Sequence, residues 1–349
     1  MTGGPVLITG GAGFIGSNLA DRLASQGQEV LVLDNLSRPG VDANLDWLTR
    51  RHPRLVSSVI ADIRDFATVE RAARDAVAVF HFAAQVAVTT SVIDPMDDFE
   101  INVHGTVRLL DALRRRPDPA PLIFASTNKV YGDLADVKLR LGDEAWHPTD
   151  PRLREHGVSE DRSIGFHTPY GCSKGAADQY VLDWARSYGV PTAVLRMSCV
   201  YGTRQRGNED QGWVAHFLLR ALRGEPVSIF GDGHQVRDIL FVDDAVDAYV
   251  AAWDRIGDIA GTAFNLGGGP RNAVSLLQVI GCIERVTGRR IDLHFEDWRP
   301  GDQRWFVADI ARATAALGLA APLHWETGIA RLSEWCVAEG VARAVEPAQ

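Results

Sequence analysis

A glycine-rich turn near the amino terminus constrains the fold more than any other stretch of this chain. The apolar run PVLIT leads directly into GGAGFIG at residues 10–16. Glycines at this spacing let the backbone turn tightly from a strand into a helix and approach a pyrophosphate without a clash from a Cβ atom. The first helical residues then offer free N–H groups and the positive end of the helix dipole to the phosphates. The predicted dinucleotide contacts in this turn are Gly10, Gly13, Phe14, Ile15 and Gly16.

Short apolar runs alternate with amphipathic segments over the first 196 residues. The runs PVLITG, EVLVLD, LVSSVIAD, AVAVFHFAA, PLIFAST and PTAVLRM are almost continuously apolar, which is typical of strands covered on both faces. Between the first two, Ile15, Leu19 and Leu23 recur every four residues, as on one face of a helix. The alternation predicts an α/β fold with a Rossmann-type, doubly wound parallel sheet.

We expect two units in the chain. Residues 1–195 would form the dinucleotide-binding Rossmann domain, and residues 236–262 would return to it as a strand and a helix. Residues 196–235 and 263–340, with many glycines, prolines and tryptophans, would form a smaller α/β lobe that binds the substrate.

Composition excludes several classes of partner. A formal net charge of −9 disfavours a nucleic acid or an anionic membrane. The chain lacks an apolar stretch of about 18 residues and a charged-then-apolar leader, so we expect neither membrane insertion nor secretion. Its four cysteines are far apart, which indicates reduced thiols in a cytoplasm. The ten histidines show no metal-ligand spacing, so no metal site is expected.

Acidic residues follow the second and third apolar runs. Asp34 is placed to accept both hydroxyls of an adenosine ribose and to repel a 2′-phosphate, which favours NAD over NADP. Arg38 lies nearby and could pair with a 2′-phosphate, which leaves NADP open. The alternative is that Arg38 is a solvated loop residue without a role in cofactor choice. Asp62 and Ile63 would lie at the adenine edge, although an aspartate at a strand end is as often a helix cap.

The motif Tyr170-Gly171-Cys172-Ser173-Lys174 carries the expected chemistry. Residues four apart share a helical face, so the ammonium of Lys174 would lie near the phenol of Tyr170. Together with an oxidised nicotinamide ring it would lower the pKa of that phenol. The phenolate could then remove a proton from a substrate hydroxyl as hydride leaves. The motif alone is weak evidence, because Y-x-x-x-K occurs often by chance.

The motifs in combination resemble one family. GGAGFIG, Asp34-Asn35, HFAAQ at 81–85, Asn102-Val103 with Gly105-Thr106, the FAST strand and YGCSK are together similar to the extended short-chain dehydrogenase/reductases, the nucleotide-sugar epimerases and dehydratases. The resemblance runs from residue 5 to about 335. Within the family, STNKVYGDL, FHTPYGCSKGAADQY, DQGWV and DQRWFVADI resemble the CDP-paratose 2-epimerase (CDP-tyvelose 2-epimerase) branch. The arginine-rich segment 139–166 is unlike that branch, which leaves the sugar and the base open.

The resemblance implies roles for individual residues. Thr127 would hydrogen-bond the sugar oxygen that is oxidised and complete a catalytic set with Tyr170 and Lys174. Further cofactor contacts would be Asn35, Ser37, Phe82, Ala83, Ala84, Gln85, Asn102, Ser126, Tyr170 and Lys174. Substrate contacts would be Gln85, Thr127, Asn128, Cys199, Gln211, Trp213, Val214, Arg237, Arg299 and Asp302.

Simpler explanations exist for several of these side chains. Arg237, expected with Arg299 to clamp the diphosphate, could form an ion pair with Asp238 instead. Trp213 could pack between the lobes, and Asp302 could simply hold an arginine.

The two residues after Thr127 separate the reactions of the family. Similar sugar 4,6-dehydratases place Asp-Glu there to move protons during elimination, whereas this chain has Asn128 and Lys129. An amide and an ammonium cannot replace two carboxylates, so elimination is disfavoured. The alternative for Lys129 is a solvated surface charge.

The resemblance therefore implies a nucleotide-sugar epimerase with tightly bound NAD. The sugar would be oxidised to a keto sugar, turn over in the pocket and receive the same hydride on its opposite face. Inversion at C2 and a CDP-linked sugar rest on the resemblance alone. A UDP-sugar 4-epimerase or another nucleotide-sugar oxidoreductase or dehydratase remains open, as does a cofactor-binding protein without turnover. We also expect a homodimer or homotetramer.

Overall fold

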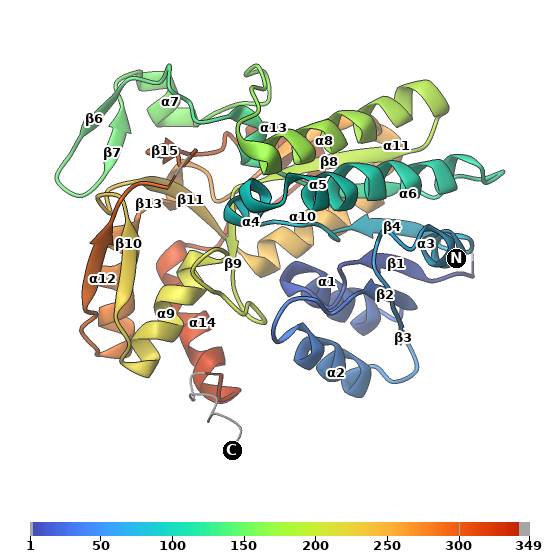
Figure 1. Ribbon diagram of the computed structural model, residues 1–349, viewed down its shortest axis with the longest axis horizontal. Helices are drawn as coiled ribbons and strands as arrows, with labels where there is room; N and C mark the ends of the chain where they lie inside the picture. The colour runs from blue at the N-terminus through green and yellow to red at the C-terminus, as the bar shows by residue number, and fades with distance from the viewer. Residues whose placement is uncertain (1–2, 300, 342–349) are drawn as a thin grey trace.

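The computed structural model describes residues 3–299 and 301–341, and within these ranges its centre is a parallel sheet of seven strands (Figure 1). Residues 1 and 2 of the expected first domain lie outside the described residues. In spatial order the strands are β12 (Thr262–Leu266), β8 (Thr192–Met197), β5 (Leu122–Thr127), β4 (Ala78–His81), β1 (Val6–Thr9), β2 (Val30–Asp34) and β3 (Val56–Ile60). The predicted doubly wound parallel sheet is confirmed.

Helices cover both faces of this sheet (Figure 1). One face packs against α1 (Phe14–Ser25), α2 (Val41–Arg51) and α10 (Val242–Asp254), and the other against α3 (Phe66–Ala73), α6 (Gly105–Arg114) and α8 (Thr168–Tyr188). Successive strand side chains alternate between the two cores: Ile8 belongs to the first and Leu7 to the second. Both are fully buried, which explains why the strands are apolar along their whole length.

The order of the strands fixes where a ligand can bind. Strands β1, β2 and β3 run outward to one edge, and the chain then crosses back to place β4 on the other side of β1. In open parallel sheets ligands bind outside the carboxyl ends of the strands, at the point where the order reverses. That point lies between β1 and β4, directly beside the glycine-rich turn.

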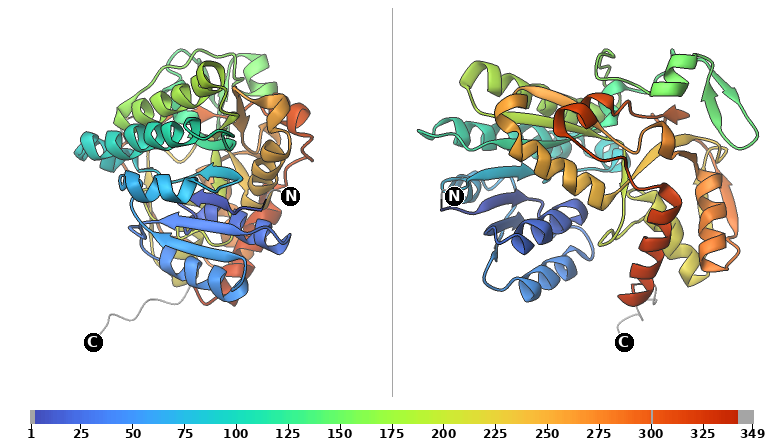
Figure 2. Two further views of the ribbon diagram at one scale, coloured as in Figure 1. Left: turned by 90° about the vertical axis from the view of Figure 1, so that its right-hand side faces the viewer. Right: turned by 180° about the vertical axis from the view of Figure 1, so that it is seen from behind.

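A smaller lobe stands beside the carboxyl edge of the sheet (Figure 2). It contains β9 (Cys199–Tyr201), β11 (Val236–Phe241), β13 (Ala273–Ser275) and β15 (Trp305–Phe306), and the parallel pair β10 (Val227–Phe230) and β14 (Leu293–Glu296). Its longer helices are α9 (Trp213–Arg223), α12 (Leu276–Thr287) and α14 (Trp325–Ala338).

Short elements complete the fold. They are α4 (Val88–Ile93), α5 (Pro95–Phe99), the π-helical turn η1 (Glu100–His104), the 3-10 turns η2 (Asn128–Tyr131) and η3 (Pro270–Asn272), β6 (Leu139–Leu141), β7 (Trp146–Pro148), α7 (Pro151–His156), α11 (Ile256–Ile259) and α13 (Ala311–Leu317). The hairpin β6–β7 projects from the body of the molecule (Figure 1). Among the described residues no helix combines the length and the apolar character that a bilayer crossing requires.

The structure places two segments differently from the expected domain boundaries. Residues 263–266 were expected in the smaller lobe, yet β12 pairs with β8 at the edge of the central sheet. Residues 236–241 were expected to return to the Rossmann domain, yet β11 pairs with β9, β13 and β15 in the smaller lobe. The following helix α10 does return, because it packs against α1. The assignment of the two units to cofactor and to substrate stays a prediction.

A buried ion pair joins α8 to the sheet. Arg196 on β8 donates to both carboxylate oxygens of Asp178 on α8, at 3.0 and 2.9 Å. The hydroxyl of Ser126 on β5 donates to the same carboxylate at 2.7 Å, and Arg196 also donates to the hydroxyl of Tyr131 at 3.1 Å. The side chains of Asp178 and Arg196 are 1% and 6% exposed. The network therefore fixes α8 against the carboxyl ends of β5 and β8.

Removal of one charge of this pair should be far more damaging than removal of an exposed one. We expect Arg196→Met to lower the free energy of unfolding by about 3–5 kcal/mol, because Asp178 is left as an uncompensated buried charge. Arg186→Met is the matched control: Arg186 pairs with Asp183 on the same helix with its side chain 83% exposed, and its loss should cost about 1 kcal/mol or less. Urea denaturation of both variants measures the difference, and equal losses would contradict the assigned role of the buried pair.

Candidate active site

The carboxyl edge of the sheet and the smaller lobe enclose one large cleft. Its volume is about 1100 Å³, whereas a site for one small ligand usually occupies about 300–1,000 Å³. The lining runs from the glycine-rich turn at one end to the residues around Arg299 in the smaller lobe at the other. The cleft therefore has room for a dinucleotide and a second ligand together.

Nearly all of the predicted cofactor contacts line this cleft. They are Gly10, Gly13, Phe14, Ile15, Gly16, Asp34, Asn35, Ser37, Arg38, Asp62, Ile63, Phe82, Ala83, Ala84, Gln85, Ser126, Tyr170 and Lys174. The structure thus brings together residues from the ends of β1, β2, β3, β4 and β5 and from α8. Their individual contacts with a cofactor remain predictions.

The glycine-rich turn has the shape of a phosphate cradle. Gly10 has a φ of +69°, and a Cβ atom there would lie 2.7 Å from the backbone N of Ala83. A Cβ atom at Gly16 would lie 2.5 Å from the carbonyl oxygen of Gly10. Helix α1 starts after Gly13 without a side-chain cap, so its first N–H groups lack intrahelical partners and open onto the cleft. These features fit the pyrophosphate of a dinucleotide.

Asp34 is held rigidly at the edge of the cradle. Its carboxylate accepts from the backbone N–H groups of Ala12 at 3.0 Å and Leu36 at 2.9 Å, and partial burial raises its pKa. Each oxygen keeps further lone pairs, which suits the two ribose hydroxyls. Arg38 lines the cleft but is solvent-exposed, which agrees with its explanation as a solvated loop residue and gives NADP no advantage over NAD.

Asp62 is not the cap of the next helix. The side chain of Asp65 accepts from Thr68 N and caps α3 instead. Asp62 accepts from the guanidinium of Arg64 and from the amide of Asn35, and these bonds hold its pKa well below the usual range. The alternative explanation of Asp62 as a cap is therefore wrong, and its carboxylate lies in the cleft lining.

Asn102 is the predicted cofactor contact that the structure does not bring to the lining of the cleft. It lies in the π-helical turn η1 with 1% of its surface exposed. Its amide donates to the carbonyl of Gln85 at 2.9 Å and to the hydroxyl of Ser173 at 3.0 Å, and its Oδ1 accepts from the N–H of Gln85 at 2.9 Å. Asn102 therefore ties the loop after β4 to helix α8. Ser126 also has its hydroxyl engaged away from the cleft, with Asp178.

Three side chains converge where β5 ends. Thr127 is the last residue of β5, and Tyr170 and Lys174 lie on one face of the first turns of α8. The ammonium of Lys174 donates to the carbonyl of Ala125 at 2.6 Å and lies 4.1 Å from the ring centroid of Phe124. All three line the cleft, as the motif spacing predicts.

Burial shifts the two titratable groups of this set in opposite directions. It raises the pKa of Tyr170 to about 12, although the Thr127 hydroxyl and the charge of Arg38 act to lower it. It lowers the pKa of Lys174 to about 7. The expected lowering of the Tyr170 pKa required an oxidised nicotinamide ring beside Lys174, so it stays a prediction; among the side chains alone, burial is the largest influence on this pKa. A cation beside the phenol would be needed to reverse the shift.

The predicted substrate contacts all line the same cleft. They are Gln85, Thr127, Asn128, Cys199, Gln211, Trp213, Val214, Arg237, Arg299 and Asp302. Trp213 donates its Nε1–H to the thiol of Cys199 at 3.5 Å and packs edge-on against Phe217 of the same helix. Both contacts lie within the smaller lobe, so they do not support packing between the lobes, and contact of Trp213 with substrate stays a prediction. No residue of the segment 139–166 is part of the lining.

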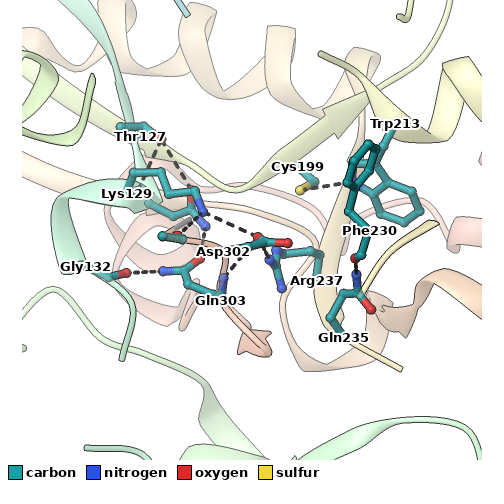
Figure 3. Close-up of polar contacts among 12 residues, drawn as sticks. Thr127, Lys129, Gly132, Cys199, Trp213, Phe230, Gln235, Arg237, Asp302 and Gln303 are labelled. Atoms are coloured by element: carbon teal, nitrogen blue, oxygen red, sulfur yellow. Dashed lines mark hydrogen bonds and ion pairs between the residues drawn. The ribbon is translucent and has the colours of Figure 1, made fainter. Parts of the chain in front are cut away.

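Sequence reasoning missed Phe230 and Gln235 at the far end of the cleft (Figure 3). The guanidinium of Arg299 lies 3.8 Å from the ring centroid of Phe230. Gln235 donates its amide N–H to the carbonyl of Phe230 at 2.7 Å, which fixes the orientation of the amide because a carbonyl can only accept. Its own oxygen has no hydrogen-bond partner among the described residues. Phe230 could have been predicted from the sequence, because it ends an apolar run directly before a Gly-Asp-Gly turn.

Arg237, Asp302 and Lys129 form one charged cluster (Figure 3). Arg237 donates to Oδ1 of Asp302 at 2.6 Å, and the ammonium of Lys129 lies 3.7 Å from the same oxygen. An ion pair of Arg237 with Asp238 is therefore not formed; Asp238 accepts from the Ser198 hydroxyl and the Gly269 N–H instead. Asp302 was expected either to accept from a nucleotide hydroxyl or to hold the nearby Arg299; it holds Arg237 instead, and Arg299 lies 3.5 Å from Asp210. Lys129 is not a solvated surface residue, because its side chain is 23% exposed and lines the cleft.

The described residues contain no group of histidine, cysteine, aspartate and glutamate side chains that could hold a metal ion.

Comparison with known proteins gives consistent results. The model of the NAD dependent epimerase/dehydratase family matches residues 6–267. The CDP-paratose 2-epimerase of Salmonella typhi is 42% identical over 339 residues, which cover 95% of this chain and 98% of that protein. The UDP-glucose 4-epimerase of Thermotoga maritima, solved with UDP-glucose, is 32% identical with a TM-score of 0.82 over 96% of this chain and 99% of that one. The UDP-glucose 4-epimerase of Thermus thermophilus, solved with NAD, is 31% identical with a TM-score of 0.79 over 95% and 98%.

The cradle predicts a specific effect of one added methyl group. Gly16→Ala should raise the dissociation constant of NAD about tenfold or more, because the new Cβ meets backbone atoms that cannot move independently. Gly281→Ala is the matched control, since a Cβ at this position in α12 meets only the end of the Arg285 side chain at 3.7 Å. NAD released from the purified proteins measures the effect, with circular dichroism to verify folding. Full NAD content in folded Gly16→Ala would contradict the assignment.

Proposed function

Because the chain belongs to the NAD dependent epimerase/dehydratase family, we propose that it is an NAD-dependent nucleotide-sugar epimerase that inverts C2 of a CDP-linked sugar. The observation that carries this proposal is one cleft that joins the phosphate cradle, the Thr127–Tyr170–Lys174 set and the cationic residues of the smaller lobe. A regulator that only binds a cofactor would not require the last two.

Side chains of the protein would accept and return the proton of the sugar hydroxyl. The phenolate of Tyr170 accepts the proton of the sugar hydroxyl, and the Thr127 hydroxyl at the end of β5 hydrogen-bonds the same sugar oxygen. Lys174, fixed by its bond to the Ala125 carbonyl, holds the phenol in an electropositive setting when protonated. NAD, bound at the glycine-rich cradle and Asp34, supplies a reversible hydride acceptor. Tyr170 returns its proton when the keto sugar is reduced, so the protein ends unchanged.

The residues after Thr127 favour epimerisation over elimination. Asn128 is engaged on both sides: its oxygen accepts from the Thr127 hydroxyl at 3.3 Å and its amide donates to Gln303 at 3.4 Å. Lys129 carries a positive charge toward Asp302. Neither supplies the carboxylate pair that similar dehydratases use for elimination.

The smaller lobe supports a nucleoside diphosphate sugar as substrate. Arg237 and Arg299 offer guanidinium groups, which bind phosphate oxygens with charge and paired donors. The unpartnered oxygen of Gln235 suits the amino group of cytosine, a donor that uracil lacks at that position. This agrees with the name of the Salmonella relative. The four free cysteines support a reducing cytoplasm as its location.

A UDP-sugar 4-epimerase is the second candidate. The similarity to the UDP-glucose 4-epimerase of Thermotoga maritima over 96% of the chain favours it, and inversion at C4 would use the same catalytic set.

Product analysis distinguishes the two candidates. Incubation of the purified holoenzyme with CDP-paratose should give the C2 epimer, because Asn128 and Lys129 replace the carboxylates that similar dehydratases use for elimination and the set for reversible oxidation is present. UDP-glucose serves as the parallel substrate, and proton NMR of the released sugars identifies the inverted carbon. Inversion of UDP-glucose at C4 with CDP-paratose left unchanged would replace the first proposal by the second.

Tyr170→Phe tests the assigned base. We expect turnover to fall by about 10²- to 10⁴-fold, the usual contribution of general acid–base catalysis, while the NAD content stays that of the wild type. Tyr180→Phe on the same helix is the matched control, since Tyr180 is 44% exposed and outside the cleft lining. Unchanged turnover in Tyr170→Phe would mean that another group takes the proton.

A further inference from the structure

Lys129 is held next to the catalytic threonine by the backbone. It lies in the turn η2 directly after β5, and its backbone N–H donates to the hydroxyl oxygen of Thr127 at 3.2 Å. Its side chain then extends toward the smaller lobe, where the ammonium donates to the carbonyl of Gly301 at 3.3 Å (Figure 3). The amine therefore joins the catalytic strand to the loop that carries Asp302.

The ammonium keeps unused binding capacity. It has three N–H donors, and among the described residues only the Gly301 carbonyl accepts one of them within hydrogen-bond distance. The carboxylate of Asp302, 3.7 Å away, already accepts from Arg237 at 2.6 Å. Lys129 and Arg237 thus share one negative charge, which leaves the cluster with a net charge of +1. The neighbouring Cys199 thiol does not change this, because burial raises its pKa and keeps it neutral.

A partly buried cation with unmatched charge needs an anion. Burial lowers the pKa of Lys129, although Asp302 acts against that shift. A phosphate in the cleft would supply the missing negative charge and accept from the free N–H groups. Arg237 and Lys129 both approach Oδ1 of Asp302, so the two cations lie close enough together to receive oxygens of one diphosphate.

The carbon that reacts decides how close that diphosphate must lie to Thr127. In a nucleotide sugar the phosphate is attached to C1, which is bonded to C2 and lies across the ring from C4. The reacting carbon must lie beside the catalytic hydroxyls. In an enzyme that oxidises C2, the sugar-proximal phosphate therefore lies nearer to these hydroxyls than in an enzyme that oxidises C4, and the difference is most of the width of the sugar ring. Lys129 starts two residues after Thr127 and its side chain lines the same cleft, which makes it a candidate for this contact, whereas Arg299 lies beside Phe230 in the smaller lobe.

We propose that Lys129 binds the sugar-proximal phosphate of the substrate and thereby presents C2, rather than C4, to Thr127 and Tyr170. This role rests on the proposed function, because it explains how a catalytic set shared with 4-epimerases is directed to a different carbon. Lys129 is then a specificity-determining residue, and Asp302 positions it together with Arg237. A purely structural ion pair that only closes the Gly301–Asp302 loop is the competing role.

The affinities of the holoenzyme for CDP and CMP distinguish phosphate binding by Lys129 from a purely structural ion pair. CMP lacks the sugar-proximal phosphate, so Lys129→Met should weaken binding of CDP by about 10- to 100-fold and leave that of CMP nearly unchanged. Lys129→Arg should restore much of the preference for CDP because it retains the charge. Lys138→Met, which removes an exposed lysine outside the cleft lining, is the control and should bind both nucleotides as the wild type does. Titration calorimetry gives the ratio of the two dissociation constants.

Turnover of CDP-paratose supplies the second readout. In Lys129→Met we expect the rate of inversion at C2 to fall and oxidation or inversion at C4 to become detectable by NMR and by NADH absorbance. An unchanged ratio of CDP to CMP affinity in Lys129→Met would overturn the proposed role, and so would equal weakening of both nucleotides. Wild-type protein that inverts C4 and not C2 would overturn the proposed function and with it the link to C2. The phosphate contact itself would still be judged by the affinity ratio.

Discussion

Asp178 lies one helical turn beyond Lys174, and its buried ion pair with Arg196 decides where α8 sits on the sheet. Taking both charges out of water is costly, so the pair is tolerable only with its full set of hydrogen bonds, including the one from Ser126. Ser126 immediately precedes Thr127. One network therefore sets the end of β5 and the start of α8 relative to each other, and every distance within the catalytic set depends on it.

The burial that fixes the positions of these side chains also opposes the ionisation of Tyr170 and Lys174. Desolvation favours the neutral forms, so the pKa of Tyr170 rises and that of Lys174 falls. Between the two values, from about 7 to about 12, both side chains are mostly uncharged in the protein alone. A phenolate then depends on positive charge brought into the cleft beside it.

Sequence patterns predicted the features that depend on residues close together in the chain. The cradle, the strand–helix alternation and the Tyr170–Lys174 face each depend on residues a few positions apart. The missed features depend on distant partners. Strand β12 is a short run without helical or strand periodicity, and only its pairing with β8 defines it. Asn102 turns away from the cleft because of a π-helical turn, which has no simple sequence signal. The burial of Lys129 requires the loop at Gly301, far along the chain.

The two positions after Thr127 show how one framework can serve different reactions. The catalytic set moves a proton and orients a hydroxyl in any member of the family, so it cannot by itself choose a product. A carboxylate next to the reacting carbon offers a second proton transfer and permits elimination. An ammonium at the same place offers no base, but it attracts the one strong anion that every nucleotide sugar carries. Because that anion is covalently attached to C1, the proposed role of Lys129 would let the sign of the charge beside Thr127 bear on both the type of reaction and the carbon that lies within reach of Tyr170.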